Sequence, residues 1–292
     1  MGKKEGGEGE IVDAEIFYFS GTGNSLVIAR DIAIQLNAQQ TPIVPLMGKV
    51  QVETNADTIG IIFPVHNVVN GGVPLIVRRF VAALQTKPAA YIFAVCTCGA
   101  GSGETLANIE KIIKAGGRKL AAGFTVKMPF NCPPFTDTAE QTKRFQDWHQ
   151  TLTEICETVE AHYENKIISV NPIIKVVSYP LGVLMKSLIL RNYRKLAQGP
   201  NLTFDEAVYQ VDQSYFYDDK CDGCGICAKV CPVNNIEMVA KRPTWQHHCE
   251  SCLGCLVWCP RRAIYGGLLS GTDERYHHPQ VKLAEMMKQR KD

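Results

Sequence analysis

The segment EIFYFSGTGNS, residues 15–25, decides the first fold assignment of this chain. Its first five residues form an apolar run of the kind that makes a buried strand. The run ends in a loop of two glycines, three hydroxyl side chains and one asparagine. Apolar residues then recur at helical spacing, at Leu26, Ala29, Ile32, Ala33 and Leu36. The segment therefore predicts a strand, a tight loop and a helix in direct succession.

The same alternation continues downstream. Further strand candidates are Thr58–Phe63, Tyr91–Cys96 and Leu120–Val126, and helix candidates are Pro74–Leu84, Glu104–Lys114 and Ala139–Tyr163. Strands that alternate with helices form parallel sheets covered on both faces. We therefore expect an α/β fold with a doubly wound parallel sheet over residues 13–168. Residues 1–12 are rich in Gly, Glu and Lys, which predicts disorder.

The loop at residues 20–25 has the composition of a phosphate site. Unpaired N–H groups and the helix dipole at a helix N-terminus attract anions, and glycine lets the backbone approach them closely. No Lys stands in the Walker position and the G-x-G-x-x-G spacing is absent, which disfavours a nucleoside triphosphatase and a dinucleotide site. An ordinary capped helix is the alternative, because Asn24 and Ser25 are both good N-caps.

A duplicated cysteine run, CDGCGICAKVCP at 221–232 and CESCLGCLVWCP at 249–260, holds eight of the twelve cysteines. Each copy reads C-x2-C-x2-C-x3-C-P, in which three cysteines wrap one side of a 4Fe–4S cluster and the fourth ligates the other cluster. Paired zinc sites are the alternative, but they have no role for a third in-phase cysteine. We expect two 4Fe–4S clusters, one on Cys221, Cys224, Cys227 and Cys259, the other on Cys249, Cys252, Cys255 and Cys231.

The composition of the chain bears on its partners and on its location in the cell. The net charge of +2 and the lack of a basic stripe give no support for nucleic-acid binding. Residues 1–10 lack the apolar core of a signal peptide, and thiolates that bind iron need a reducing compartment, so we expect a cytoplasmic protein. Residues 173–190 are apolar but interrupted by Lys175, Pro180, Gly182 and Lys186, which predicts a docking helix rather than a transmembrane segment. A membrane-surface helix is the alternative.

The two motifs together resemble the EFR-type ferredoxin family, in which a flavodoxin-like domain is fused to a bacterial-type two-cluster ferredoxin. The loop at 20–25 is similar to the S/T-x-T-G-x-S/T phosphate loop of flavodoxins, and the resemblance covers residues from about 14 to 268. It implies a sheet of order 2-1-3-4-5 and bound FMN, with the flavin ring between loops at 64–72 and 97–103. The implied FMN residues are Ser20, Gly21, Thr22, Gly23, Asn24, Ser25, Pro64, Val65, His66, Asn67, Thr97, Cys98, Gly99, Gly101 and Gly103.

One departure from flavodoxins concerns the flavin ring. Neither ring-facing loop contains Trp, Tyr or Phe, so His66, Phe130 or Phe135 is the candidate to stack on the ring. A flavin with one open face would meet a substrate or partner there, and weaker FMN binding is the alternative. Cys96 and Cys98 are interpreted as buried structural thiols, with a redox disulfide as the alternative.

The resemblance implies flavin- and iron–sulfur-dependent electron transfer with a redox partner protein. The chain would act as an electron carrier or as an FMN-dependent oxidoreductase, and no catalytic residue is assigned. A non-catalytic electron-wiring subunit of a larger complex, with the flavodoxin fold as its docking platform, is the alternative. Residues 169–213 are expected to form a helical connection, 214–268 the ferredoxin domain, and 269–292 a polar tail. The oligomeric state stays open.

Overall fold

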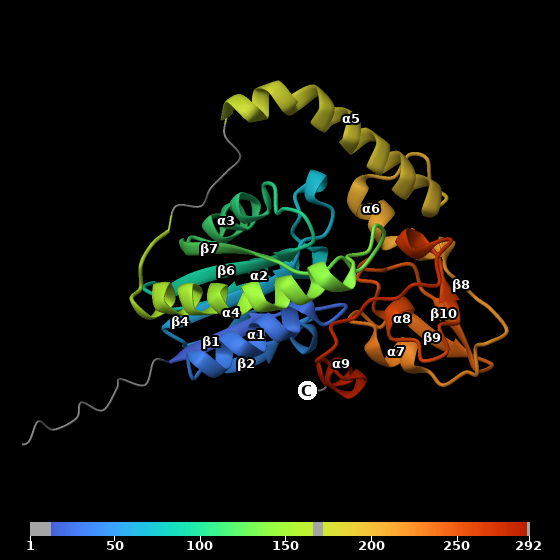
Figure 1. The fold of residues 1–292 in the computed structure, drawn as a ribbon, viewed down its shortest axis with the longest axis horizontal. Coiled ribbons are helices and arrows are strands. Elements are labelled where there is room, and N and C mark those ends of the chain that lie inside the picture. Colours follow the sequence, from blue (N-terminus) through green and yellow to red (C-terminus); the bar gives the residue numbers. More distant parts are fainter. Residues whose placement is uncertain (1–12, 166–171, 291–292) are drawn as a thin grey trace, which may run out of the picture.

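Five parallel strands form the central sheet of the structure, a computed structural model that describes residues 13–165 and 172–290. The segment 1–12, for which disorder is predicted, lies outside the described residues, as do the first residues of the expected connection and the last of the expected tail. The strands lie in the order β2 (Gln39–Pro42), β1 (Ala14–Tyr18), β4 (Thr58–Pro64), β6 (Tyr91–Cys98) and β7 (Leu120–Lys127) (Figure 1). Counted within this sheet the order is 2-1-3-4-5, which confirms the predicted flavodoxin-like fold class.

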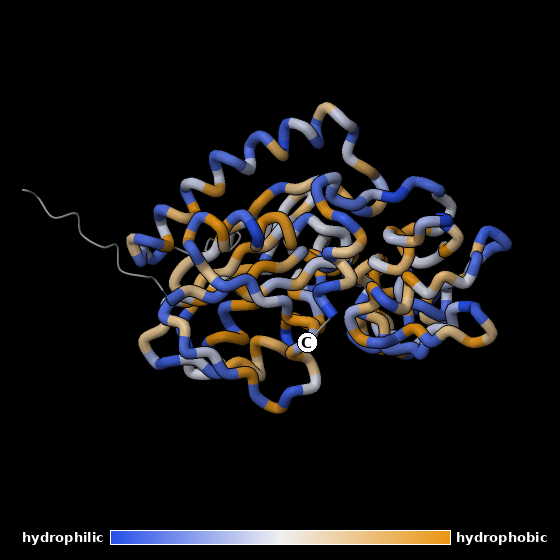
Figure 2. The backbone as a smooth tube through the Cα atoms, turned by 90° about the horizontal axis from the view of Figure 1, so that it is seen from below, coloured by the Kyte–Doolittle hydropathy of each residue, from blue (hydrophilic) through white to orange (hydrophobic). Residues whose placement is uncertain are grey.

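Helices cover both faces of the sheet because successive side chains of a strand point to opposite faces. From β1, Ile16 and Tyr18 join the core beneath α1 (Asn24–Gln35) and α4 (Thr138–Glu160). Phe17 joins the opposite core, beneath α2 (Leu75–Ala83) and α3 (Thr105–Ala115). Figure 1 shows α1 and α4 together on one side of the sheet, and in Figure 2 apolar positions concentrate in its interior.

The four predicted strands and four predicted helices all occur, within three residues of their expected bounds at nearly every end. Within the main sheet, β2 is the strand without a counterpart among the predicted strands. Its sequence, QQTP, has no apolar residue except the proline, and the strand lies at the sheet edge with all four residues partly or fully exposed. Apolar periodicity could not reveal a strand that buries no apolar side chain. A separate pair of two-residue strands, β3 (Val52–Glu53) and β5 (Leu84–Gln85), lies beside the main sheet.

The two cysteine runs lie in a second, smaller α+β unit. Each run places its third cysteine on a short helix, Cys227 on α7 (Ile226–Val230) and Cys255 on α8 (Gly254–Val257). Two antiparallel strand pairs accompany them: β9 (Ile236–Val239) with β10 (Arg242–Trp245), and β8 (Phe216–Tyr217) with β11 (Ile264–Tyr265). The two runs therefore lead into β9 and β11 at the same offset, as the sequence repeat predicts.

Between the two units run α5 (Pro172–Leu196) and α6 (Phe204–Tyr209), so the region expected to carry helices does so. Leu184 and Leu188 on α5 are about half exposed, whereas Tyr193 and Ala197 at its end are buried. In the part of the chain that the structure describes, no helix is long and apolar enough to cross a membrane.

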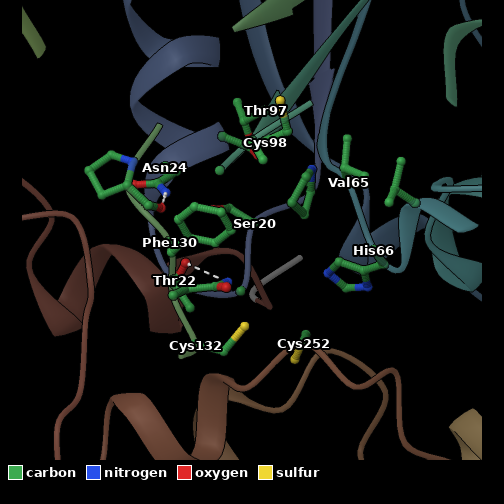
Figure 3. A pocket seen from close by; sticks show the side chains of 18 of the residues that line it. Ser20, Thr22, Asn24, Val65, His66, Thr97, Cys98, Phe130, Cys132 and Cys252 are labelled. Atoms are coloured by element: carbon green, nitrogen blue, oxygen red, sulfur yellow. Dashed lines mark hydrogen bonds between the residues drawn. The ribbon is translucent and has the colours of Figure 1, made fainter. Parts of the chain in front are cut away.

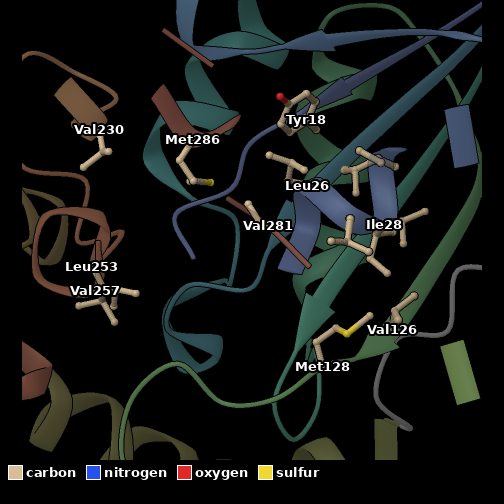
Figure 4. Close-up of a cluster of buried hydrophobic side chains, with 14 of the residues drawn as sticks. Tyr18, Leu26, Ile28, Val126, Met128, Val230, Leu253, Val257, Val281 and Met286 are labelled. Carbon is tan, nitrogen blue, oxygen red and sulfur yellow. The ribbon is translucent and has the colours of Figure 1, made fainter. Parts of the chain in front are cut away.

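One hydrophobic core runs through both units. The chain end, including α9 (Leu283–Lys288), supplies part of it. Figure 4 shows side chains of this core from three parts of the chain: Tyr18, Leu26 and Ile28 from the sheet unit, Val230, Leu253 and Val257 from the cysteine unit, and Val281 and Met286 from the chain end. Because the two units share buried side chains, the two sequence motifs have a fixed relationship to one another.

Candidate functional site

The loop at residues 20–25 turns from β1 into α1 with its polar side chains buried. Gly23 precedes the helix with φ of 100°, a left-handed conformation that favours glycine. The Gly23 N–H donates to Ser20 Oγ at 3.1 Å, and Ser25 Oγ lies 2.8 Å from Thr97 Oγ1 at the end of β6. The first N–H groups of α1 have no partner within the helix, so they are free to face an anion.

Most residues implied for FMN surround one cavity of about 210 Å³, which we call the central pocket. Figure 3 shows its lining side chains converging from the ends of β1, β4 and β6. Of the implied residues, only Gly23 and Gly103 do not line it; Gly103 instead contacts Val68. The other lining residues are Val68, Ala100, Pro129, Phe130, Asn131, Cys132 and Cys252. A concave site that combines apolar walls with a few converging polar groups suits a cofactor.

Phe130 supplies the aromatic side chain that the two loops lack. Its ring lies against Gly99, where an added methyl group would come within 2.4 Å of the ring. The guanidinium carbon of Arg144 lies 5.8 Å from the ring centroid. In Figure 3 the Phe130 ring projects into the pocket, whereas Phe135 is not among the lining residues. Gly99 is therefore needed for the close approach of this ring.

Two titratable side chains of the pocket are held neutral by burial. Burial lowers the pKa of His66 to about 4, so its imidazole carries no charge near pH 7. Burial likewise raises the pKa of the Cys98 thiol to about 11, although Lys127 and Arg144 oppose this. Cys96 faces away, into the core beneath α2 and α3, and is a buried free thiol like Cys98.

The chain end closes over the loop at 20–25, which sequence reasoning did not anticipate. Tyr276 donates from its hydroxyl to Asn24 Oδ1 at 2.7 Å, and the N–H of His278 donates to the Thr22 carbonyl at 2.9 Å. The Asn24 amide in turn donates to the Pro129 carbonyl at 3.0 Å. Because its side chain is engaged on both sides, Asn24 offers an anion its backbone N–H only.

Four cysteines gather into what we call the outer cysteine group: Cys221, Cys224, Cys227 and Cys259. They line a common narrow cavity, and Cys224 is exposed. Burial, and more weakly the nearby thiols of the other three, raise the pKa of Cys227 to about 11. Thiols that resist ionisation alone suit a bound cation, because a cation favours the thiolate.

The inner cysteine group consists of Cys231, Cys249, Cys252 and Cys255, all buried. Burial raises the pKa of Cys255 well above its usual range, and the thiols of Cys249, Cys252 and Cys231 add to this. Backbone N–H groups donate to sulfur in both groups, from Asn235 to Cys231 at 3.3 Å and from Ala263 to Cys259 at 3.4 Å. Each group thus combines three cysteines of one run with the last cysteine of the other.

Among the described residues, no three His, Cys, Asp or Glu side chains meet as one metal ion requires. A cube of four irons and four sulfides is a larger body than one ion and holds its thiolates around its outside. The donor set of each group, four thiols with nearby N–H donors, fits the soft thiolate ligation that a 4Fe–4S cluster uses.

The central pocket and the inner cysteine group touch. Cys252 lines the pocket, and a side-chain carbon at Gly21 would lie 2.2 Å from the Cys252 carbonyl oxygen. The indole of Trp258, between the last two cysteines of its run, donates to the Gly21 carbonyl at 3.0 Å. Sequence analysis did not foresee this contact, because nothing in either motif records the other's position.

Comparison with known proteins supports one motif directly. A family model described as a 4Fe-4S binding domain matches residues 215–237, which include the first cysteine run. No curated protein matches the chain.

Solved structures with some likeness include three flavoproteins. A putative flavoprotein from Bacteroides uniformis is 18% identical, with 47% of this chain and 97% of that chain covered and a TM-score of 0.31. A flavodoxin from Megasphaera elsdenii is 19% identical, with 41% and 90% covered and a TM-score of 0.31. A Streptococcus pneumonia flavodoxin is 14% identical, with 49% and 98% covered and a TM-score of 0.31.

Proposed function

We propose that this chain transfers electrons between FMN in the central pocket and two 4Fe–4S clusters held by the inner and outer cysteine groups. The proposal assigns the chain to the EFR-type ferredoxin family, with a flavodoxin-like domain at 13–168 and a ferredoxin domain at 214–268. The observation that carries it is the position of Cys252, which belongs to the inner group and also lines the central pocket.

The contacts define an order for the three sites. The central pocket meets the inner group at Cys252. The inner group lies beside the outer group, because α8, which carries Cys255, packs against α7, which carries Cys227. The outer group reaches the surface at Cys224, which is exposed. Electrons would therefore pass between the pocket and the surface through the inner group first, and a protein partner would dock near Cys224.

The residues around these sites would bind the FMN and tune the reduction potentials of the cofactors. The hydroxyls of Ser20, Thr22 and Ser25 and the first N–H groups of α1 would hold the FMN phosphate. His66, kept neutral by burial, would bring no charge to the ring, and Phe130 would pack against it. N–H groups that donate to cysteine sulfur would shift the cluster potentials. When bound, FMN exchanges one or two electrons, and each cluster exchanges one.

Cofactor counts test the proposal. Anaerobically purified protein is expected to contain about eight irons and one FMN per chain, with the absorption of both cofactors. Zinc in place of iron would contradict the cluster assignment. Clusters without flavin, even after FMN is added, would instead favour a wiring subunit whose flavodoxin fold serves for docking.

A second measurement tests electron transfer within the chain. Substoichiometric reductant is added to the loaded protein, and the flavin and cluster signals are followed by absorption and electron paramagnetic resonance. The electrons are expected to reach the same distribution between flavin and clusters with and without small redox mediators. A distribution that stays constant for hours and then changes when mediators are added would rule out internal transfer.

A further inference from the structure

A second cavity, of about 340 Å³, adjoins the central pocket, and we call it the side cavity. Its walls include the segment after β4, the helices α5 and α6, and the start of the second cysteine run. Six residues line both cavities: Val65, His66, Asn67, Val68, Asn131 and Cys132. A molecule in the side cavity would therefore lie directly beside the expected flavin ring.

The lining of the side cavity is mostly apolar and its charges are already paired. Leu75, Ile189, Phe204, Val208, Leu253 and Leu268 give it an apolar body. Arg78 makes a bidentate pair with Asp205, with nitrogen–oxygen distances of 2.9 and 3.0 Å. The buried Glu250 carboxylate is paired with Arg79 at 2.5 Å and accepts from the Ile76 N–H at 2.9 Å. Because each charge is matched, the cavity favours a neutral ligand over an ionic one.

Two hydrogen-bond donors of the lining lack a partner within the described part of the chain. Asn70 Nδ2 and Arg78 Nε are both shielded from solvent, and neither has a hydrogen-bond acceptor among the described residues. Buried donors of folded proteins are paired in the great majority of cases, and an unpaired one costs about 1–3 kcal/mol. Both residues also border a neighbouring groove, which Lys111 lines as well. A small rotation of either side chain toward the cavity would let its donor reach an acceptor oxygen on a ligand.

We propose that the side cavity binds a small neutral molecule with a mainly apolar body and a carbonyl oxygen. The apolar walls would hold the body, and Asn70 or Arg78 would donate to the oxygen. The electron exchange of such a ligand with the flavin rests on the proposed function, but its binding does not.

Ligand-observed saturation-transfer NMR tests the binding, on anaerobically purified full-length protein whose iron and flavin have been counted. The probes are 1-tetralone, its hydrocarbon analogue tetralin, and the anion 1-naphthoate. We expect 1-tetralone to bind at least fivefold more tightly than tetralin, which is about 1 kcal/mol for one hydrogen bond, and more tightly than 1-naphthoate. Equal affinity for tetralone and tetralin, or tighter binding of the anion, would overturn the proposal.

Variants of the cavity walls test whether 1-tetralone binds in the side cavity. Leu268→Trp and Ile189→Trp each fill the side cavity from a different wall and are expected to weaken 1-tetralone at least tenfold. Asn70→Ala is expected to weaken 1-tetralone about fivefold and leave tetralin unchanged. Lys111→Ala alters only the neighbouring groove and should have no effect. Tetralone binding that survives both tryptophan variants, or is lost in Lys111→Ala, would place the ligand elsewhere.

The two proposals can fail separately. Protein with eight irons and one FMN that ignores 1-tetralone would refute the ligand and leave the electron-transfer function standing. Protein that lacks flavin but binds 1-tetralone in the side cavity would refute the flavin part of the electron-transfer proposal and leave the ligand proposal standing.

Discussion

The indole N–H of Trp258 donates a hydrogen bond to the carbonyl of Gly21, with 3.0 Å between nitrogen and oxygen across 237 residues of sequence. This bond joins the second cysteine run to the loop that begins α1. Both partners are buried, and the Trp258 side chain also stacks on His277, with 4.3 Å between ring centroids. The two motifs of the sequence are therefore in direct contact at Gly21.

Replacing the Trp258 indole should weaken the contact between the second cysteine run and the loop at 20–25. Trp258→Phe removes the donor and leaves the Gly21 carbonyl buried and unpaired, which costs about 1–3 kcal/mol. Trp245→Phe is a matched control, because Trp245 is equally buried but its indole nitrogen has no partner among the described residues. Denaturant unfolding of both variants should show the greater loss for Trp258→Phe. Equal losses would mean that the hydrogen bond contributes nothing to stability.

Substitution at Gly21 should disturb both sites at once. An added methyl group would lie 2.2 Å from the Cys252 carbonyl oxygen, so the loop and the cysteine run must move apart. We expect Gly21→Ala to cost about 1–3 kcal/mol and to weaken FMN binding at least tenfold, measured by flavin fluorescence. Gly101→Ala serves as control, since it also lines the pocket but has open space around it. Similar FMN affinity in the two variants would contradict the contact.

Cysteine substitutions should distinguish the expected cluster ligands from buried thiols of the hydrophobic core. Cys252→Ser removes one expected ligand of the inner group, and the iron content should fall from about eight toward about four per chain. Cys156→Ala removes a buried thiol on α4, outside both cysteine runs, and should leave the iron content unchanged. Iron and labile sulfide are measured after anaerobic purification. A full iron content in Cys252→Ser would remove this residue from the ligand set.

The ion pair between Glu250 and Arg79 should matter more than a surface pair. The Glu250 side chain is fully buried, accepts from the Ile76 N–H at the start of α2, and links the cysteine unit to the sheet unit. Glu250→Gln is expected to lower the free energy of unfolding by about 1–3 kcal/mol, because the amide has one acceptor oxygen for the two donors, Arg79 and the Ile76 N–H, and its own NH2 then faces the other donor. Asp147→Asn, which breaks the exposed pair with Lys143, should cost under about 1 kcal/mol. Equal costs in urea unfolding would contradict a joining role for Glu250.

The chain end should make stability depend on pH. Burial lowers the pKa of His278 to about 4, so the folded state disfavours its protonated form. The unfolded chain takes up this proton near pH 6.5, and stability is therefore present above that pH and lost as pH falls toward 4. Between about pH 7.5 and 5.5, wild type should lose about 1 kcal/mol more than His278→Gln in urea unfolding. Parallel pH profiles would show that the pKa of His278 is the same in the folded and the unfolded chain.

The sequence predicted the sheet well because each inner strand is a short apolar run between loop residues. It failed at β2, where an edge strand of Gln, Thr and Pro buries no apolar side chain. Phe130 was among the aromatic candidates for the pocket, but only the fold shows its ring against Gly99. Local spacing could group three cysteines of each run, and the fourth required the ferredoxin rule rather than any local signal.

The contacts between the motifs could not be predicted at all. Trp258 has the sequence environment of a packing residue, and Tyr276 and His278 lie in a polar stretch without periodicity. Their partners, Gly21, Asn24 and Thr22, are more than 200 residues away. Long-range hydrogen bonds between unlike motifs leave no repeating pattern in one sequence.

The closure of the first loop by the last part of the chain has a consequence for biosynthesis. The loop at 20–25 is among the first described residues to leave the ribosome, whereas Tyr276 and His278, which hold Asn24 and Thr22, are among the last. Cys252, which lines the same pocket, and Trp258, which donates to the Gly21 carbonyl, also emerge late. A nascent chain therefore carries an unfinished pocket until residues 276–278 have been made. Under the proposed function, flavin loading would follow the folding of the cysteine unit, and a product truncated before that unit would have neither site complete.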